Sequence, residues 1–210
     1  MCRQHHILFH TDASQSAGKT PLNVSDLGVD LLTLAGHKMY APKGIGALYT
    51  KKGIHLEPLI HGASHERGRR AGTENVMFAV ALGTACKLAS AMDIEQTREL
   101  TRYFYTRLKA AYGDIIKLNG HPEKRLPNTL NISFIGSNGH DILDALDHVA
   151  ASTGSACHSG LSSVSPVLKA MGVNDSVGQG AIRFSLGRYT TPDEIEEVLK
   201  RLSQIIPVVQ

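Results

Sequence analysis

The stretch Leu31-Leu32-Thr33-Leu34-Ala35-Gly36-His37-Lys38 carries a lysine just beyond an apolar run. The run over residues 31–35 predicts a buried β-strand, and Gly36 ends it, so that Lys38 leaves the end of the strand. Apolar surroundings disfavour the ammonium form of a lysine and leave a neutral amine that can attack an aldehyde. Lys38 is therefore a candidate to form a Schiff base.

A second apolar run, Ile7-Leu8-Phe9-His10-Thr11-Asp12, ends in a carboxylate. Its first four residues predict another strand. Pyridoxal phosphate (PLP) requires a lysine that forms an imine and an acid that faces the pyridinium nitrogen. Lys38 and Asp12, which follow two predicted strands, are that pair of residue types and suggest a PLP site.

The composition is that of a globular protein. The chain has 210 residues, of which 42% are hydrophobic and 20% charged, and it is long enough to bury a core. No apolar stretch approaches the length that spans a bilayer, so we expect no membrane insertion. The net charge of +3 comes from scattered basic residues, apart from a cluster at 65–70, and only 5% of the residues are aromatic. We therefore expect no nucleic acid partner.

The three cysteines, Cys2, Cys86 and Cys157, include no Cys-x-x-Cys pair and form no spaced framework. Neither a disulfide scaffold nor a zinc motif is indicated, and a reducing cytosol fits this usage best. The N-terminus shows no secretory signal, so we expect a cytoplasmic protein. We expect no metal site, although two histidine pairs leave that alternative open, His61 with His65 and His140 with His148.

Alternating apolar runs and helical patterns predict an α/β chain. Strands are expected at 7–10, 31–35, 47–50, 115–118 and 129–135, and helices at 73–89, 94–112, 140–148 and 192–206. Thr73 is the expected cap of the first long helix. The loop at 56–72 is rich in His, Arg and Gly, and its length favours a functional role. A change of pattern near residues 91–93 divides the chain into a cofactor-bearing part, 1–92, and a C-terminal part, 93–210.

The segment at 151–163 is rich in Gly and Ser and holds Cys157. A thiol on a mobile loop can move between a substrate and a distant acceptor, as a group-transfer nucleophile must. His158, if charged, would favour the reactive thiolate. The alternative is a small buried cysteine on an ordinary loop.

Arg183 interrupts the apolar strand pattern that begins at Ala181. An inward guanidinium is costly unless it meets an anion, and its planar fork suits a carboxylate in a two-point contact. We expect Arg183 to bind the carboxylate of a substrate. The alternative is a structural ion pair with an acid from another strand.

Four motifs together resemble those of the PLP-dependent cysteine desulfurases and selenocysteine lyases, which are aminotransferase class V-like proteins. They are Thr11-Asp12-Ala13-Ser14-Gln15, Gly36-His37-Lys38, Gly154-Ser155-Ala156-Cys157 and Arg183-Phe184-Ser185-Leu186-Gly187-Arg188. The resemblance covers nearly the whole chain. It implies an aspartate-aminotransferase-like α/β fold (PLP fold type I), in which 1–92 is the C-terminal part of the large PLP-binding domain and 93–210 is a small α+β domain.

The resemblance also implies roles for single residues around the cofactor. Lys38 is similar to the lysine that binds PLP, and Asp12 to the partner of the ring nitrogen. Gln15 is similar to a hydrogen-bond donor to the ring hydroxyl, and His37 to a histidine that contacts PLP. Thr73 is similar to a residue that touches the phosphate of the partner subunit, which implies a homodimer.

Cys157 is similar to the nucleophile that takes sulfur from L-cysteine, and Arg183 to the residue that binds the substrate carboxylate. The implied reaction yields L-alanine and an enzyme persulfide, which passes to a sulfur-acceptor protein, for example in iron–sulfur cluster assembly. L-selenocysteine is an alternative substrate. A PLP aminotransferase that needs no thiol is a third possibility.

Two departures from the family pattern stand out. Ala35 replaces a serine that often binds phosphate. Family members are usually about twice as long as this chain, so residues from the N-terminal half of the large domain are absent. A different class of function is therefore an incomplete fragment that acts as a dimerisation or interaction module, or that a second polypeptide completes.

Overall fold

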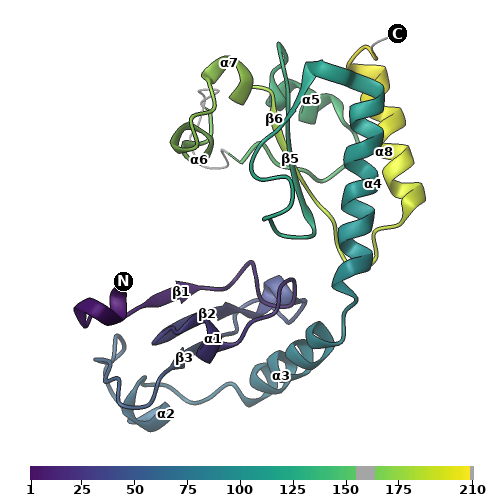
Figure 1. The fold of residues 1–210 in the computed structure, drawn as a ribbon. Coiled ribbons are helices and arrows are strands. Elements are labelled where there is room, and N and C mark those ends of the chain that lie inside the picture. Colours follow the sequence, from purple (N-terminus) through teal and green to yellow (C-terminus); the bar gives the residue numbers. More distant parts are fainter. Residues whose placement is uncertain (155–163, 209–210) are drawn as a thin grey trace. The chain divides into compact units, whose positions relative to one another are not determined.

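The computed structural model describes residues 1–154 and 164–208. It divides into two compact units, which we call the first unit (Met1–Met92) and the second unit (Asp93–Gln210). Figure 1 shows both as mixtures of helices and strands. The assignment of these units to the large and small domains of a longer enzyme stays a prediction.

The first unit is built on a three-stranded sheet. In chain order its elements are η1 (Cys2–His5), β1 (His10–Asp12), α1 (Val24–Leu27), β2 (Leu31–Ala35), η2 (Gly36–Met39), β3 (Gly46–Thr50), α2 (His65–Gly68) and α3 (Val76–Ser90). The strand order is β1-β2-β3, with β1 parallel and β3 antiparallel to β2. The connection through α1 is what allows β1 and β2 to run in the same direction.

The core of the first unit is made largely of small residues. One cluster gathers Ala13, Val29 and Leu32. A second places Met39 of η2 among alanines of α3 and of the segment after β1. The backbone approaches closely there, since a Cβ added at Gly18 would lie 2.8 Å from the Cβ of Ala89. This packing fixes η2 and the turn after β1 against α3.

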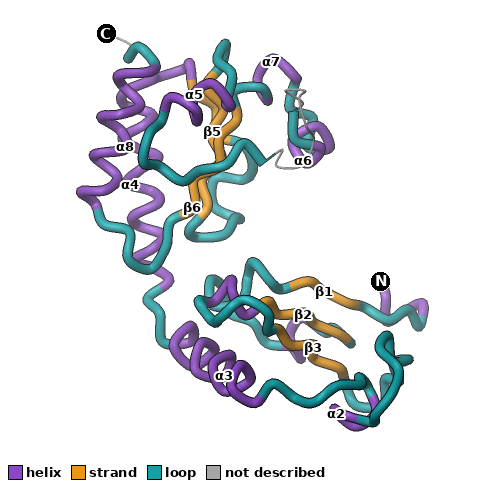
Figure 2. Tube along the Cα trace, turned by 180° about the vertical axis from the view of Figure 1, so that it is seen from behind, coloured by secondary structure: helices purple, strands orange, loops and turns teal. Residues whose placement is uncertain are grey.

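The second unit packs two helices on an antiparallel sheet. Its elements are α4 (Ile94–Tyr112), η3 (Gly113–Ile115), β4 (Ile116–Leu118), β5 (Thr129–Phe134), α5 (Gly139–Ala145), α6 (Pro166–Ala170), α7 (Asp175–Gly178), β6 (Ala181–Ser185) and α8 (Pro192–Ile205). The strand order is β4-β5-β6. Figures 1 and 2 show α4 and α8 side by side along this sheet.

Large apolar side chains fill the space between helices and sheet in the second unit. Phe104 meets Phe184 edge to face at 5.1 Å between ring centroids, and Tyr112 meets Phe134 at 5.6 Å. The helices begin at side-chain caps. The Asp93 carboxylate accepts from two backbone N–H groups of α4, and Thr191 forms a capping box with Glu194 at the start of α8.

Most expected elements are confirmed to within a few residues, and three details are wrong. The first strand is His10–Asp12 and not 7–10, because only those residues pair with β2, while Ile7 and Leu8 are exposed. Asn75, and not Thr73, caps α3, since its side chain accepts from the N–H of Phe78 at 3.1 Å. The helix expected at 140–148 ends at Ala145.

Among the described residues, no single helix is long and apolar enough to cross a membrane. In that part of the chain, only the consecutive helices α3 and α4, taken together as a bent pair, would have the length and composition of a membrane span.

Candidate active site

Asp12 ends β1 as an exposed carboxylate held by a local turn. Its Oδ1 accepts a hydrogen bond from the backbone N–H of Ser14 at 2.8 Å. The hydroxyl and the N–H of Ser14 hold the pKa of the Asp12 carboxyl below its ordinary value. The carboxylate is therefore ionised at neutral pH, which is the form that would face a protonated ring nitrogen.

Lys38 lies in η2, directly after β2. The backbone N–H of Gly36 donates to the Ile45 carbonyl at 2.9 Å, and a Cβ on Gly36 would lie 2.8 Å from that oxygen. Only glycine fits this close approach. Met39 is 4% exposed and anchors the other end of the turn. His37 and Lys38, between these two buried residues, are both exposed.

The exposure of Lys38 corrects one expectation. Apolar residues do not enclose its amine in the described structure, because the turn directs Gly36 and Met39 into the core and leaves the residues between them outside. Ala35 precedes η2 and forms no side-chain cap. Ala35 therefore supplies no hydroxyl in place of the serine that often binds phosphate in the family.

The strand pairing brings the ends of β1 and β2 together. The two strands are parallel and adjacent, and Asp12 is in register with Thr33, five residues before Lys38. The backbone N–H of Ala13 donates to the Thr33 carbonyl at 2.9 Å. Asp12 therefore lies at the carboxyl end of β1 and Lys38 just beyond that of β2, which is the edge where α/β proteins place their ligands.

Lys19 contacts Gln15, is affected by the charge of Lys38 and was not identified from the sequence. Its Nζ donates to the backbone oxygen of Gln15 at 3.0 Å and approaches the side-chain oxygen at 3.4 Å. Burial, and then the positive charge of Lys38, lower the pKa of Lys19. The two ammonium groups thus lie close enough to repel, and an anion placed there would be stabilised by both.

His10 is the second residue that the sequence did not single out. Its Nε2 lies 2.8 Å from the hydroxyl of Thr33, and its charge adds to the lowering of the Asp12 pKa. Side chains alternate along a strand, so residues 10 and 12 share one face of the sheet. This alternation could have identified His10 from the sequence as a neighbour of Asp12.

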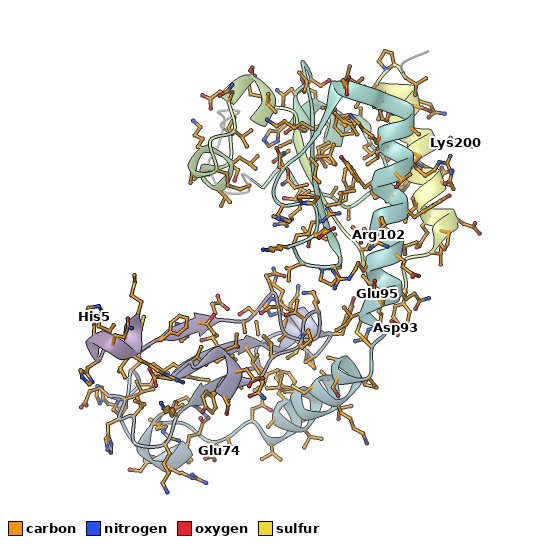
Figure 3. The ribbon with its side chains drawn as sticks, viewed as in Figure 1. His5, Glu74, Asp93, Glu95, Arg102 and Lys200 are labelled. Atoms are coloured by element: carbon orange, nitrogen blue, oxygen red, sulfur yellow. The ribbon has the colours of Figure 1, made fainter. Side chains whose placement is uncertain are left out.

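Thr73 lies in the loop before α3 and is exposed. The loop is shaped by an ion pair between Arg70 and Glu66 at 2.8 Å and by the N–H of Glu66, which donates to Glu74 at 3.3 Å. Figure 3 labels Glu74 in this part of the first unit. The expected contact of Thr73 with a partner subunit stays a prediction.

Arg183 lies on β6 with its neighbours Ile182 and Phe184 buried and its own side chain exposed. The expected inward guanidinium is therefore wrong, because the strand period places residue 183 on the face away from the core. Within residues 1–154 and 164–208 Arg183 forms no ion pair, so the alternative of a structural pair is not met there.

The chain that leads to Cys157 is fixed to the same strand. Ser152 exchanges two backbone hydrogen bonds with Arg183, at 2.6 and 3.2 Å, and the N–H of Gly154 donates to the Ser152 hydroxyl. Cys157 itself lies outside the described residues, as does His158. Among the described residues, no group of three or more metal-ligating side chains gathers in one place.

The family model described as "Aminotransferase class-V" matches residues 1–198. The chain belongs to this family. The family assignment agrees with the α/β architecture and with the parallel strand ends that carry Asp12 and Lys38.

Curated proteins similar to this chain include two cysteine desulfurases. The chain is 45% identical to "Cysteine desulfurase IscS" of Dictyoglomus turgidum, a match that covers 98% of this chain and 53% of that protein. It is 47% identical to "Cysteine desulfurase 2" of Trichormus variabilis, over 95% of this chain and 51% of that protein. The chain therefore spans about half the length of the curated relatives it matches.

Solved structures agree with the family assignment. The NifS-like protein of Rickettsia africae superposes with a TM-score of 0.86 at 28% identity, over 97% of this chain and 55% of that one. A structure titled "SspA in complex with cysteine" gives a TM-score of 0.72 at 32% identity, over 90% of this chain and 53% of that one. The expected PLP fold type I is confirmed by these neighbours.

Proposed function

We propose that this class-V aminotransferase family member supplies the lysine-bearing part of a PLP-dependent cysteine desulfurase. The observation that carries the proposal is the placement of Asp12 at the end of β1 and of Lys38 just beyond the parallel neighbouring strand β2, in a chain 45% identical to a cysteine desulfurase. The substrate would be L-cysteine, and the products L-alanine and a persulfide on Cys157.

The residues of the first unit fit PLP by their chemistry. Asp12 is an ionised carboxylate suited to the ring nitrogen. Lys38 carries the amine that would bind the cofactor, and Lys19 adds a second cation beside it. The side-chain oxygen of Gln15 faces the Lys19 ammonium, which leaves the amide NH₂ to donate to a ring hydroxyl. His37 is exposed on the same turn as Lys38 and is available for contact.

The remaining residues would carry the chemistry of sulfur transfer. PLP, when bound, withdraws electrons from the substrate and loosens its C–H and C–S bonds. Arg183 would hold the substrate carboxylate through its two-pronged guanidinium. The amine of Lys38 would carry the proton of the α-carbon. The Cys157 thiolate would form an S–S bond as the C–S bond breaks, and the carbon would take a proton to become the methyl group of alanine.

The partners follow from the same proposal. The persulfide would pass to a sulfur-acceptor protein, and Thr73 would contact the second copy in a homodimer. A reducing cytosol is the compartment in which a free thiol at Cys157 would persist. L-Selenocysteine is the alternative substrate, because it presents the same amine and carboxylate. Parallel assays of alanine formation from both amino acids would distinguish a desulfurase from a selenocysteine lyase.

Reductive trapping tests the assignment of Lys38. The purified chain is incubated with PLP, reduced with borohydride and digested, and the labelled peptide is mapped by mass spectrometry. We expect the label on Lys38, none at that position in Lys38→Arg, and wild-type labelling in Lys43→Arg, which changes another exposed lysine nearby in sequence. Label spread over surface lysines, or no label, would reject a cofactor site formed by this chain alone.

A sulfide assay separates the desulfurase from an aminotransferase that needs no thiol. We expect Cys157→Ala to abolish sulfide release from L-cysteine in the presence of dithiothreitol. An aminotransferase would keep its turnover of amino acid in the same variant.

An interaction module is the second candidate, and exposed apolar residues of the first unit favour it. Leu8, Leu48, Leu59 and Met77 are 50% exposed or more. In the described part of the chain, β1 and β3 each pair with only one strand and so present free edges. Mixing this chain with the missing half of a relative would test it: complex formation without desulfurase activity would favour the module, and restored activity would favour the enzyme.

A further inference from the structure

A cavity of about 440 Å³ lies within the second unit, apart from every residue assigned to the proposed function. Side chains of α4 form one wall, and the loop between β4 and β5 forms the other. Three arginines, Arg98, Arg102 and Arg125, line it together with the hydroxyl-bearing ring of Tyr105. Its volume is in the range of sites that bind small organic molecules.

The loop wall is already ordered by its own hydrogen bonds. The ring Nδ1 of His121 accepts from the backbone N–H groups of Glu123 and Lys124, at 3.0 and 2.9 Å. The Arg125 side chain donates to the Pro122 and Thr129 carbonyls, at 3.1 and 3.3 Å. The loop therefore needs no large rearrangement to hold a ligand, which lowers the entropic cost of binding.

The charges that line the cavity are unbalanced. The residues that line the cavity include three arginines and one acid, Glu123, so positive charges in the lining exceed negative ones by two. Arg98 shares its charge with Glu95 at 3.0 Å, and Figure 3 shows Glu95 and Arg102 on the same helix, α4. In the described residues neither Arg102 nor Arg125 forms an ion pair.

Arg125 has two carbonyl acceptors but no carboxylate partner among the described residues. It is half-buried, and desolvation is the main cause that lowers its pKa. A guanidinium in this position gains most from an anion that restores the lost solvation. Its planar donors, with those of Arg102, suit the oxygens of a phosphate group.

Apart from Thr101, the rest of the lining is apolar. It consists of Leu118, Leu126 and two prolines of the loop, Pro122 and Pro127. A free inorganic anion would leave this surface without a partner. An organic group attached to the phosphate would cover it, and the Tyr105 ring offers a flat surface for a base or a sugar.

We propose that this cavity binds an organic phosphate of about the size of a nucleoside monophosphate, with Arg102 and Arg125 on the phosphate and the loop prolines and Tyr105 against the organic group. The site is separate from the proposed desulfurase chemistry, so its success or failure does not depend on that chemistry.

Binding of AMP, inorganic phosphate and citrate to the purified chain, measured by isothermal titration calorimetry at low ionic strength, tests the proposal. We expect one saturable site for AMP and at least about tenfold weaker binding of AMP by Arg102→Gln, since hydrogen bonds to charged groups are among the stronger ones. Arg125→Gln removes both loop contacts and can disturb the loop, so Arg102→Gln, at an exposed helix position, is the deciding variant.

Lys200→Gln is the matched control, because it removes one positive charge from an exposed position of α8 (Figure 3) and Lys200 does not line the cavity. We expect it to bind AMP as the wild type does. The proposal is overturned if AMP does not bind saturably, or if Lys200→Gln weakens binding as much as Arg102→Gln. Inorganic phosphate or citrate that binds as tightly as AMP would overturn the assignment to an organic phosphate.

Discussion

Tyr112 offers a quantitative test of the core of the second unit. Its side chain is fully buried at the end of α4, and its hydroxyl has no hydrogen-bond partner within the described residues. Burial raises the pKa of Tyr112 to about 12, from an ordinary value of 10.0. We predict that Tyr112→Phe stabilises the second unit at neutral pH, by about 1 kcal/mol, because an unpartnered buried hydroxyl is costly.

The same substitution changes the dependence of stability on pH. The unfolded chain releases the tyrosine proton above pH 10, whereas the folded chain keeps it until about pH 12. Stability from this group is thus complete below pH 10 and is lost as the pH rises towards 12 and above. The shift of about two pH units corresponds to a loss of up to about 2.7 kcal/mol, of which about 1.4 kcal/mol has occurred by pH 11.

Urea denaturation followed by circular dichroism at pH 8 and pH 11 measures this difference. The wild type should lose about 1.4 kcal/mol more than Tyr112→Phe between the two pH values, because other ionisations cancel in the comparison. Tyr189→Phe is the control, since Tyr189 is 81% exposed. Equal pH dependence in wild type and Tyr112→Phe would refute the argument from burial.

Three further predictions concern the turn at Lys38, the charge beside it and the cap of α8. Gly36→Ala should destabilise the first unit by about 1–3 kcal/mol, because its Cβ would lie 2.8 Å from the Ile45 carbonyl; an unchanged urea midpoint would contradict the close approach. Lys38→Gln should raise the pKa of Lys19, since it removes a neighbouring positive charge, and NMR titration of labelled lysines would detect this; an unchanged Lys19 titration would separate the two ammonium groups. Thr191→Ala should cost about 1 kcal/mol by loss of the capping box, measured by thermal unfolding, and Thr191→Ser should restore it.

Local signals made part of the fold predictable. The apolar run before Gly36 predicts β2 with its observed ends, because a single glycine in a tight turn stops it. Asp93 and Gly113 mark the two ends of α4 and allow the helix to be read from residues 94 to 112. In such cases the residue that ends the strand or helix can be recognised from its type alone.

The remaining details depend on contacts that a linear pattern does not contain. Ile7 and Leu8 read as strand residues, yet only pairing with β2 decides where β1 begins. The closeness of Lys19 to Lys38 arises because the turn after β1 folds back beside η2, and the outward side of Arg183 arises from the face that β6 presents to the core. Asp12, Gln15 and Lys38 were identified by their motifs, but the residues that lie next to them in the fold, such as Lys19, could not be predicted from the sequence.

The contrast between alanine-rich packing before residue 92 and aromatic packing after it has a consequence for dissection of the chain. Resistance to a protease should be unequal along the polypeptide, with early cuts in the loop that holds Thr73 and late cuts in the helices that enclose Phe104. A fragment that starts at Asp93 would keep the N-terminal cap of α4 and all the aromatic side chains in the core of the second unit. Such a fragment would also keep every residue that lines the proposed phosphate cavity.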